Sequence, residues 1–492
     1  MNVLFITLDQ FRADCLSIAG HPLVRTPHLD ALAREGVRFA RHYSQAAPCA
    51  PGRASLYTGL YAMNHRVVAN GTPLDDRFDN LARVAARGGY LPTLFGYTDQ
   101  SIDPRQAHGP NDPRLKTYEG VLPGFDVALN LPEAADAWRR WLEDFGYDVG
   151  STVPELYLGE SDRPAEHGIS AFLANHLISW IEKQAGPWFA HASFIRPHPP
   201  YAAAGEFSRA YDPDEVPPSI SPGESLHPLH QAALAGSDAA APLEEIKQRR
   251  LRAQYFGMVS AVDHELGRIW ESLKRKGQWE DTLIVVTSDH GEQLCDHGLI
   301  EKLAFFEQSY HVPCIVRDPR HGIAYGTVVE AFTENVDLLP TICDAIGVAV
   351  PLQCDGLPLT PFLEGRKPEW WRSAAHWEWD WRYILLRHGQ FSWPWNRMLE
   401  SQHLAVRRDE TTAYVQFGDG SWLGFDLATD PTWRTPQHDP SVLLASAQQM
   451  LLWRSRHADR TMTGLLLDRG PIGRWPELPT DWHARRPEQG RD

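Results

Sequence analysis

Short hydrophobic runs alternate with longer amphipathic segments along most of the chain before residue 372. Four runs contain almost no polar residue, which predicts strands buried on both faces of a sheet. They cover 3–8, 188–194, 283–287 and 312–316. A segment over 243–276 spaces its apolar residues three or four positions apart, as on one buried helix face, and Gly277 ends it. Thr26, followed by proline, predicts the N-cap of another helix. This alternation predicts a doubly wound, mainly parallel α/β sheet.

The pattern changes after about residue 372. Short alternating segments then predict an antiparallel sheet. They cover 383–386, 404–408, 412–417 and 422–427. An amphipathic stretch at 442–453 predicts a helix, and a tail rich in proline and arginine begins at Gly464. We therefore expect a catalytic α/β domain over 1–371, a C-terminal α+β subdomain over 372–463, and a tail over 464–492 at a subunit interface.

Composition narrows the class of protein. The chain has 492 residues, of which 43% are hydrophobic and 22% charged, as in an ordinary globular protein. A formal net charge of −16 without a long basic run argues against a nucleic-acid partner. No apolar run is long enough for a membrane span, and the first residues do not resemble a signal peptide. The 6 cysteines lack paired spacing, which favours reduced thiols and a cytoplasmic location.

Two predicted strands end in groups that bind cations. Asp9 and Gln10 follow the first strand, and Asp289 and His290 follow the strand at 283–287. Open α/β sheets place ligand sites at the carboxyl ends of their strands, so these side chains are candidate metal ligands. An aspartate after a strand is more often a cap or turn residue, and position alone leaves that alternative open.

The segment from Cys49 to Gly59 carries the most specific signal. It has the form C-x-P-x-R-x-x-x-x-T-G, which arises by chance in such a chain with a probability of about 10⁻⁴. A lone cysteine is usually an inert small hydrophobe. Here Cys49 precedes Pro51 at a predicted helix start, where backbone amides favour an anion, and Arg53 follows one turn later.

This segment resembles the sulfatase signature, in which cysteine is oxidised to formylglycine. The chain resembles the alkaline phosphatase superfamily over most of its length, and within it the phosphonate monoester hydrolases, which are relatives of the arylsulfatases. The resemblance implies an alkaline-phosphatase-like sheet with a smaller C-terminal α+β domain. Further segments that carry it are Asp9–Gln10, 60–66, Asn70, 96–98, 111–114, 196–200, 288–293, Asp296–His297 with Lys302, 425–431 and 457–461.

The resemblance implies one divalent metal ion. Its expected ligands are Asp9, Asp289, His290 and an oxygen of the modified Cys49, with Gln10 as a weaker fifth candidate. Typical sulfatases carry Asp-Asp and Asp-Asn at the two strand ends, which form an all-oxygen calcium site. An imidazole in place of an amide oxygen shifts the preference toward a transition metal. We expect manganese, with zinc, iron or calcium as alternatives.

The resemblance also implies a mechanism. A formylglycine at position 49 hydrates, and one hydroxyl attacks phosphorus or sulfur in line and displaces the alcohol. Loss of the proton from the second hydroxyl then restores the aldehyde and expels phosphonate, phosphate or sulfate. A plain thiol lacks that second hydroxyl. The chain would therefore need a formylglycine maturation enzyme as a transient partner, and its substrate would be a small anionic ester.

Other residues gain roles from the same resemblance. Arg53 would hold the modified residue, and His198 and Lys302 would reach the transferred anion or the leaving oxygen, with His198 as general acid. Asn70 and Tyr97 match positions that bind the non-bridging oxygens. Without the resemblance, we would interpret Lys302 as a surface charge and His198 as a residue that packs in a loop. His297 is expected behind the metal ligands.

Asp99 departs from the family pattern, which has threonine two residues after the tyrosine of the Gly-Tyr-Thr segment. A carboxylate there would disfavour a dianionic group and favour a substrate with a cationic end, or it would turn into solvent. This departure argues against phosphonate monoesters as the substrate. From the resemblance as a whole, we nevertheless expect a hydrolase of phosphonate monoesters and phosphodiesters with sulfatase side activity. The alternative is a true sulfatase acting on an aryl, choline or sugar sulfate.

Two hypotheses from other classes are less consistent with the residues. A catalytically inert, anion-binding relative would lack the nucleophile or the ligands, which are all present. A mutase or phosphatase of the wider superfamily would have serine or threonine in place of Cys49. By resemblance, and from the long tail, we expect a homodimer or homotetramer.

Overall fold

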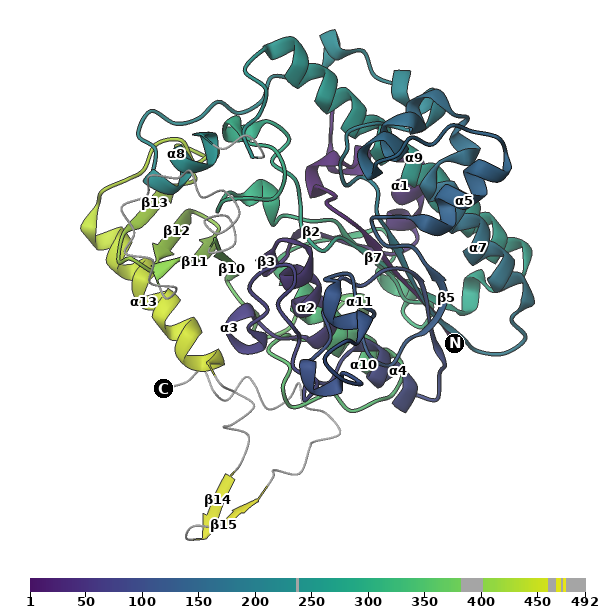
Figure 1. The fold of residues 1–492 in the computed structure, drawn as a ribbon. Coiled ribbons are helices and arrows are strands. Elements are labelled where there is room, and N and C mark those ends of the chain that lie inside the picture. The colour runs from purple at the N-terminus through teal and green to yellow at the C-terminus, as the bar shows by residue number, and fades with distance from the viewer. Residues whose placement is uncertain (236–238, 382–400, 459–465, 470–471, 475–492) are drawn as a thin grey trace.

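The computed structural model describes residues 1–235, 239–381, 401–458, 466–469 and 472–474 (Figure 1). Its larger sheet, sheet A, has eight strands in the order β5-β4-β6-β1-β7-β8-β2-β9. Their bounds are β1 Asn2–Leu8, β2 Val37–Tyr43, β4 Pro92–Gly96, β5 Asp126–Asn130, β6 Phe189–Phe194, β7 Thr282–Thr287, β8 Cys314–Arg317 and β9 Thr327–Glu334. All neighbours pair in parallel except β8, which is antiparallel to β7 and β2. The predicted doubly wound, mainly parallel sheet is confirmed.

Helices cover both faces of sheet A (Figure 1). One face carries α1 Pro27–Arg34, α5 Asp136–Asp144, α7 Ile169–Lys183 and α9 Glu245–Arg275. The other carries α2 Cys49–Thr58, α4 Leu81–Arg87, α10 Leu338–Ala345 and α11 Thr360–Leu363. Further helices are α3 Ala62–His65, α6 Val153–Leu158 and α8 Pro228–Ala235. Successive residues of β1 alternate between the two cores, with Leu4 and Ile6 in one and Val3 and Phe5 in the other, as the strand pleat requires.

The helix predicted after Thr26 forms, but its cap differs from the prediction. Thr26 occupies the N-cap position without a side-chain bond to the first turn. The Asp263 carboxylate of α9 instead accepts the backbone N–H groups of His28 at 3.1 Å and Leu29 at 2.7 Å. A residue more than 200 positions away therefore satisfies this helix start, which no local pattern indicates.

The predicted C-terminal antiparallel sheet with a helix is also confirmed. Sheet B has the order β13-β12-β11-β10-β3, and helix α13 Pro440–His457 packs against it. Its strands are β3 Ala46–Ala47, β10 Ala374–Asp380, β11 His403–Asp409, β12 Thr412–Phe417 and β13 Trp422–Asp426. The strand predicted over 383–386 lies outside the described residues, whereas β10 was not predicted.

Sheet B takes one strand from the N-terminal part of the chain. β3 pairs in parallel with β10, so that Ala46 lies opposite Glu378 and Ala47 opposite Trp379. The predicted catalytic domain therefore extends into the sheet of the predicted subdomain, and the boundary at residue 372 stays a prediction. Most of the predicted tail lies outside the described residues, apart from the hairpin of β14 Leu466–Arg469 and β15 Ile472–Arg474.

Among the described residues, the helices are too short or too polar to cross a lipid bilayer. The side chains of Cys15, Cys49, Cys295, Cys314, Cys343 and Cys354 are all buried. The predicted location in the cytoplasm stays a prediction.

Candidate active site

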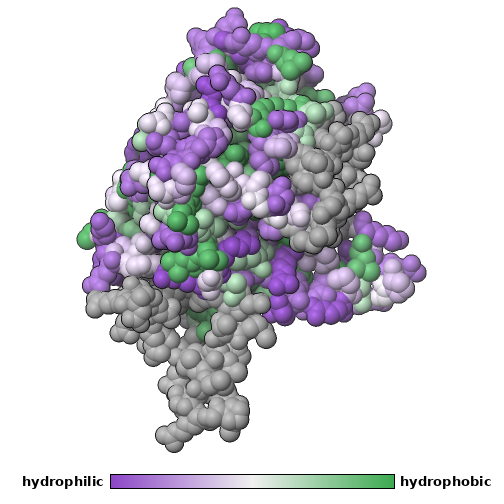
Figure 2. Space-filling view, turned by 90° about the vertical axis from the view of Figure 1, so that its left-hand side faces the viewer, coloured by the Kyte–Doolittle hydropathy of each residue, from purple (hydrophilic) through white to green (hydrophobic). Residues whose placement is uncertain are grey.

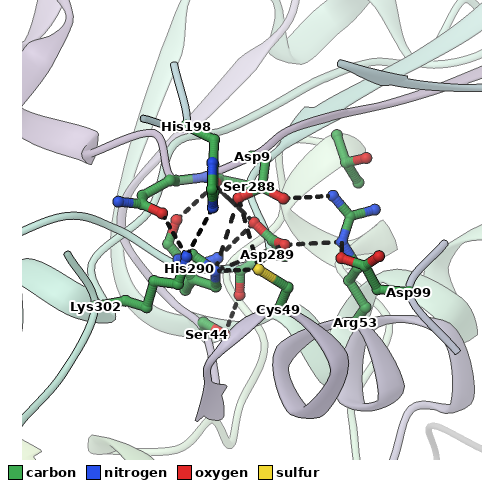
Figure 3. Close-up of polar contacts among 12 residues, drawn as sticks. Asp9, Ser44, Cys49, Arg53, Asp99, His198, Ser288, Asp289, His290 and Lys302 are labelled. Atoms are coloured by element: carbon green, nitrogen blue, oxygen red, sulfur yellow. Dashed lines mark hydrogen bonds and ion pairs between the residues drawn. The ribbon is translucent and has the colours of Figure 1, made fainter. Parts of the chain in front are cut away.

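Four predicted side chains converge at the carboxyl edge of sheet A. Asp9 follows β1, Asp289 and His290 follow β7, and Cys49 begins α2. Because β1 and β7 are neighbours and Thr7 lies opposite Thr287, their ends lie side by side. One ligand atom from each of the four residues lies within 4.8 Å of the others, and all four are buried (Figure 3). The Cys49 Sγ lies 3.3 Å from His290 Nε2.

The chemistry of this group fits a metal ion. His290 Nδ1 donates to the Gly291 carbonyl at 3.0 Å, which leaves the lone pair of Nε2 facing the group. Burial lowers the pKa of His290 and keeps its ring neutral, as a ligand must be. Burial opposes ionisation of Asp9, but the nearby His198, Arg53 and other cations lower its pKa overall. Two carboxylates and an imidazole suit a transition metal.

Arg53 ties the two acids of the group together. Its Nε donates to Asp289 Oδ2 at 2.8 Å and one terminal nitrogen donates to Asp9 Oδ2 at 3.0 Å. The other terminal nitrogen donates to Ser193 Oγ at 2.8 Å and to the Tyr57 hydroxyl at 3.2 Å. The side chain is fully buried, so the structure shows Arg53 holding the acids that flank residue 49.

His198 and Lys302 form a pair beside this group. Lys302 Nζ donates to His198 Nε2 at 2.9 Å, and His198 Nδ1 donates to the Pro199 carbonyl at 2.7 Å. Burial lowers the pKa of Lys302, but Cys49, Glu301 and other acidic groups raise it overall. Lys302 therefore stays cationic, with its Nζ directed at His198 Nε2.

Gln10 lies at the edge of the group with a left-handed φ of 68°. Its side-chain oxygen accepts from Lys302 Nζ at 2.8 Å, and its side-chain nitrogen donates to Glu292. Its backbone N–H donates to Asp289 Oδ1 at 3.3 Å. Its predicted role as a fifth metal ligand stays a prediction.

The predicted substrate-binding residues surround the same centre. Asn70 Oδ1 accepts the backbone N–H of Ala50 at 3.0 Å, next to the predicted nucleophile. The Tyr97 hydroxyl donates to Asp9 Oδ2, and its ring centroid lies 4.3 Å from the Arg53 guanidinium carbon. Both residues are therefore positioned beside the group, and their contacts with substrate stay predictions.

Asp99 is buried beside Arg53 (Figure 3). It is 3% exposed, so the alternative that it turns into solvent is wrong. Its Oδ2 lies 3.8 Å from Arg53 Nε, and its Oδ1 has no hydrogen-bond partner among the described residues. Burial raises the pKa of Asp99 well above its ordinary value, against the effect of Arg53.

His297 makes its contacts elsewhere. Its ring stacks on Phe306 with a centroid distance of 3.6 Å, and its backbone carbonyl accepts from His230 at 2.8 Å. In the part of the chain that the structure describes, neither ring nitrogen has a hydrogen-bond partner, so no contact there supports the expected position behind the metal ligands.

Several residues that support the site were not predicted. Ser288 Oγ donates to the His290 carbonyl at 2.7 Å and accepts from Phe11 N at 3.0 Å, which fixes the turn after β7. Ser44 Oγ donates to the Asp289 carbonyl. Ser288 stands in the segment that carries the resemblance, so this signal was available. Ser44 has no local sequence signal.

A model of the sulfatase family matches residues 1–348. This chain belongs to the sulfatase family. A model of the C-terminal part of N-sulphoglucosamine sulphohydrolase also matches residues 295–437 of this sulfatase-family chain.

Two relatives cover most of the sulfatase-family chain. A multifunctional alkaline phosphatase superfamily protein of Trinickia caryophylli is 34% identical over 94% of this chain and 96% of its own length. The choline-sulfatase of Rhizobium meliloti is 30% identical over 74% of this chain and 72% of its own.

Two solved structures are similar throughout. The phosphonate monoester hydrolase of Agrobacterium radiobacter has a TM-score of 0.86 at 42% identity, covering 96% of this chain and 100% of that one. The phosphonate monoester hydrolase of Silicibacter pomeroyi has a TM-score of 0.85 at 35% identity, covering 96% and 99%. The sulfatase-family chain is an ester hydrolase, and its family implies a metal ion and a formylglycine made from the cysteine.

Proposed function

We propose that this protein hydrolyses phosphonate monoesters and phosphodiesters, with sulfate esters as side substrates. The observation that carries this proposal is the convergence of Cys49, Asp9, Asp289 and His290 beside a cationic Lys302. The similarity to two phosphonate monoester hydrolases along nearly the whole chain supports the choice of substrate.

The proposed cofactor is one divalent ion, manganese in preference to zinc, iron or calcium. Asp9, Asp289, His290 and an oxygen of the modified Cys49 would hold it, with Gln10 as a further candidate. The ion would supply Lewis-acid charge at the attacking oxygen and at the transferred group. Arg53 presents the two carboxylates by binding one oxygen of each.

The state of Cys49 supports its conversion to formylglycine. Burial, followed by the charge of Asp9, raises the pKa of the thiol well above its ordinary value. A neutral thiol is a poor nucleophile and lacks the second hydroxyl that would release the product. We infer that the hydrate derived from Cys49 attacks the ester, and that a maturation enzyme is a transient partner.

Asn70 and the His198–Lys302 pair would act on the substrate itself. Because Asn70 Oδ1 accepts from Ala50, its side-chain NH₂ is the group left to donate to a non-bridging oxygen of a small anionic ester. Lys302 would neutralise the anion. His198 would pass a proton to the departing alcohol as general acid, drawing on the proton shared with Lys302.

A true sulfatase is the second candidate, and two observations favour it. The choline-sulfatase of Rhizobium meliloti is 30% identical, and the C-terminal region matches the model from N-sulphoglucosamine sulphohydrolase. Sulfate monoesters and phosphodiesters are both singly charged tetrahedral anions, so the site can accept either. The imidazole of His290 favours the first candidate, because all-oxygen sites suit calcium.

A substrate panel tests the proposal. Metal-stripped and manganese-restored enzyme is assayed on p-nitrophenyl phenylphosphonate, bis-p-nitrophenyl phosphate and p-nitrophenyl sulfate, for the native chain and Asp99→Thr. We expect the highest kcat/KM on the phosphonate. A higher kcat/KM on the sulfate would establish the second candidate instead. Unchanged ratios in Asp99→Thr would remove Asp99 from the determinants of specificity.

The expected assembly is a homodimer or homotetramer. This proposal rests on the family resemblance and on the length of the C-terminal tail. Gel filtration with light scattering tests it, and a monomer at assay concentrations would contradict it.

A further inference from the structure

A buried carboxylate, rather than an exposed surface, is the feature of this molecule that the proposed reaction does not yet use. Figure 2 shows that the face carrying α13 and sheet B is mainly hydrophilic, with hydrophobic side chains in separate groups. The described part of that face therefore does not form one broad apolar docking area. Glu292, in contrast, is fully buried and follows the candidate metal ligand His290 by two positions. Burial of a carboxylate is costly unless hydrogen-bond donors surround it.

Four hydrogen-bond donors surround the Glu292 carboxylate. Its Oε1 accepts the backbone N–H groups of Leu294 at 2.8 Å and Glu301 at 2.6 Å. Its Oε2 accepts from the side-chain nitrogen of Gln10 and from the Tyr201 hydroxyl at 3.0 Å. Hydrogen bonds to an ionised acceptor are the strong ones in proteins. Both oxygens are therefore satisfied, and the carboxylate holds each donor group in place.

These donors belong to the three segments that surround the His198–Lys302 pair. Gln10 follows β1, Tyr201 lies three positions after His198, and Glu301 precedes Lys302. The carboxylate itself comes from the segment after β7. A single side chain thus joins segments that are far apart along the chain.

The backbone at three of the residues bound to Glu292 is held in an unfavourable conformation. Gln10, Leu294 and Glu301 have φ values of 68°, 52° and 67°, in the left-handed region that favours glycine. Such conformations persist where surrounding contacts enforce them, and they are common at functional sites. The Glu292 carboxylate is a contact that all three residues share.

The contact with Glu292 also decides which way the Gln10 amide faces. An amide has a donor nitrogen on one side and an acceptor oxygen on the other. The Gln10 nitrogen faces Glu292 and, at 3.4 Å, Glu301 Oε2, so the Gln10 oxygen accepts from Lys302 Nζ at 2.8 Å. A reversed amide would place its NH₂ against the ammonium group and its oxygen against the carboxylates. In the observed orientation, Lys302 Nζ also donates to His198 Nε2 at 2.9 Å.

We propose that Glu292 is a positioning residue for the His198–Lys302 pair. It acts through the Gln10 amide, which it orients, and through the two segments that carry the pair, which it anchors. It keeps Lys302 in hydrogen-bond contact with His198 beside the candidate metal-binding group (Figure 3). The inference rests on the proposed function for what the pair does to substrate, whereas the geometry of the pair can be measured without any activity.

An exchange of the amide and the carboxylate tests this role. In Glu292→Gln, the two backbone N–H groups keep the remaining oxygen, so the new NH₂ faces the Gln10 nitrogen and drives that amide to reverse. We expect kcat/KM to fall by about 10²-fold, because Lys302 is misplaced. Gln10→Glu alone brings two carboxylates together and should also lower kcat/KM. The double variant Gln10→Glu/Glu292→Gln restores one donor and one acceptor and leaves an oxygen for Lys302, so it should be about tenfold more active than Glu292→Gln.

All variants are assayed as full-length protein at saturating manganese, on the ester that the native chain hydrolyses best. Mass spectrometry measures the formylglycine fraction, so that neither metal loading nor maturation explains a difference. Asp263→Asn is the matched control, because Asp263 is also a buried carboxylate that accepts two backbone N–H groups. It should leave kcat/KM within about twofold, since the start of α1 carries no residue of the candidate site.

Crystal structures of the same variants give a measurement that does not depend on the reaction. Lys302 Nζ should lie beyond hydrogen-bond distance of His198 Nε2 in Glu292→Gln, and the contact should return in the double variant. Native protein that is inactive on every ester of the substrate panel would refute the proposed function alone. A contact that is retained in Glu292→Gln would refute the positioning role alone.

Two kinetic results would also overturn the positioning role. The first is Glu292→Gln with native kcat/KM and a native melting temperature. The second is a folded double variant that is no more active than Glu292→Gln. Tyr201→Phe keeps the test available if the charge change prevents folding, because it removes one donor to Glu292 and no charge. It should lower kcat/KM by about 3–10-fold, and an unchanged value would contradict the role.

Discussion

Two arginines, the fully buried Arg53 and the half-buried Arg372, each bind a pair of acids, yet only one pair is available for chemistry. At Arg372, Asp337 also accepts backbone N–H groups, and Glu334 accepts the Tyr61 hydroxyl and the His376 backbone N–H. Every carboxylate oxygen there has a donor from the protein.

The acids at Arg53 differ because one carboxylate oxygen remains directed at the candidate metal ligands. Asp9 Oδ2 accepts from Arg53 and Tyr97, but Asp9 Oδ1 faces Cys49 Sγ at 4.0 Å and His290 Nε2 at 3.7 Å. An arginine–carboxylate cluster is therefore no sign of a site by itself. A carboxylate oxygen that no N–H or O–H group of the described residues satisfies, as at Asp9 Oδ1, and that converges with an imidazole is such a sign.

Removing the nucleophile should have the largest effect on the Arg53 side of this comparison. Cys49→Ala should lower kcat/KM by about 10⁴-fold or more, because the reaction loses its covalent step. Steady-state assays measure this, and mass spectrometry of the peptide containing Cys49 shows whether the native residue is formylglycine. Fully active protein with an unmodified cysteine would contradict the mechanism.

Removing the metal should affect the acids at Arg53 and leave the acids at Arg372 unaffected. A chelator should abolish activity to below about 10⁻³ of the holoenzyme, and manganese should restore it. The carboxylates of Asp337 and Glu334 at Arg372 already accept hydrogen bonds from the protein. Chelation should therefore leave their ion pairs with Arg372 intact. Activity is compared with the far-ultraviolet circular dichroism spectrum of the same sample. Full activity after complete removal of metal, measured by elemental analysis, would refute the assignment of Asp9, Asp289 and His290.

Matched substitutions of the two arginines test the comparison directly. Arg53→Lys should lower kcat/KM by about 10²–10³-fold, because a point charge cannot hold both Asp9 and Asp289. Arg372→Lys should leave kcat/KM within a few-fold and lower the free energy of unfolding by about 3 kcal/mol, because it weakens a buried pair. Urea unfolding and steady-state kinetics measure the two quantities. Equal loss of activity in both variants would end the distinction.

A substitution of His198 tests the proposed general acid beside the Arg53 group. His198→Gln should lower kcat/KM by about 10²-fold on esters of weakly acidic alcohols and much less on p-nitrophenyl esters, because good leaving groups need no proton. A series of aryl phenylphosphonates measures the dependence on the leaving group. A uniform loss across the series would show that His198 does not act as the general acid.

The smallest effect is a difference in acid sensitivity. Burial lowers the pKa of His191, which accepts from Tyr57 behind Arg53, from its ordinary value to about 3. Below pH 6.5, His191 binds a proton in the unfolded chain but not in the folded chain. This contribution to stability is present above pH 6.5 and is lost at about 1.4 kcal/mol per pH unit as the pH falls toward 3.

Glu334, which lies beside Arg372, should respond at lower pH. Burial would raise the pKa of Glu334, but Arg372 and His376 lower it to about 2. Its contribution is present above pH 4.5 and is lost only as the pH falls toward 2. Urea unfolding from pH 7 to 4.5 should thus show a smaller slope in His191→Gln than in the native chain. An equal slope would exclude His191 as a contributor.

The sequence predicted the elements that have a local period or a local motif. The buried strands before Asp9 and Asp289, the long helix α9 and the three described strands β11–β13 all follow from apolar spacing. The Cys49 segment identified the nucleophile position because its spacing is specific. Two features that sequence reasoning missed depend on distant pairs: Asp263 at the start of α1, and β3 in sheet B.

In the site, too, residues with a local sequence signal were predicted and residues that depend on distant contacts were not. Side chains at strand ends were predictable, because parallel strands end at a common edge. The supporting roles of Ser44 and Ser193 were not, because each depends on contacts between segments far apart in the chain. Asp99 was noticed as a departure, but its burial against Arg53 could not be read from its neighbours in the sequence.

The pairing of β3 with β10 has a consequence for the order of events during synthesis. Cys49 is 5% exposed in the folded chain, and the strand that leads to it pairs with residues made roughly 330 positions later. At 5–20 residues per second, a ribosome needs about 15–65 s to reach them. An enzyme that oxidises Cys49 would have to work within that interval, so the speed of translation and the supply of that enzyme would together set the fraction of chains that become active.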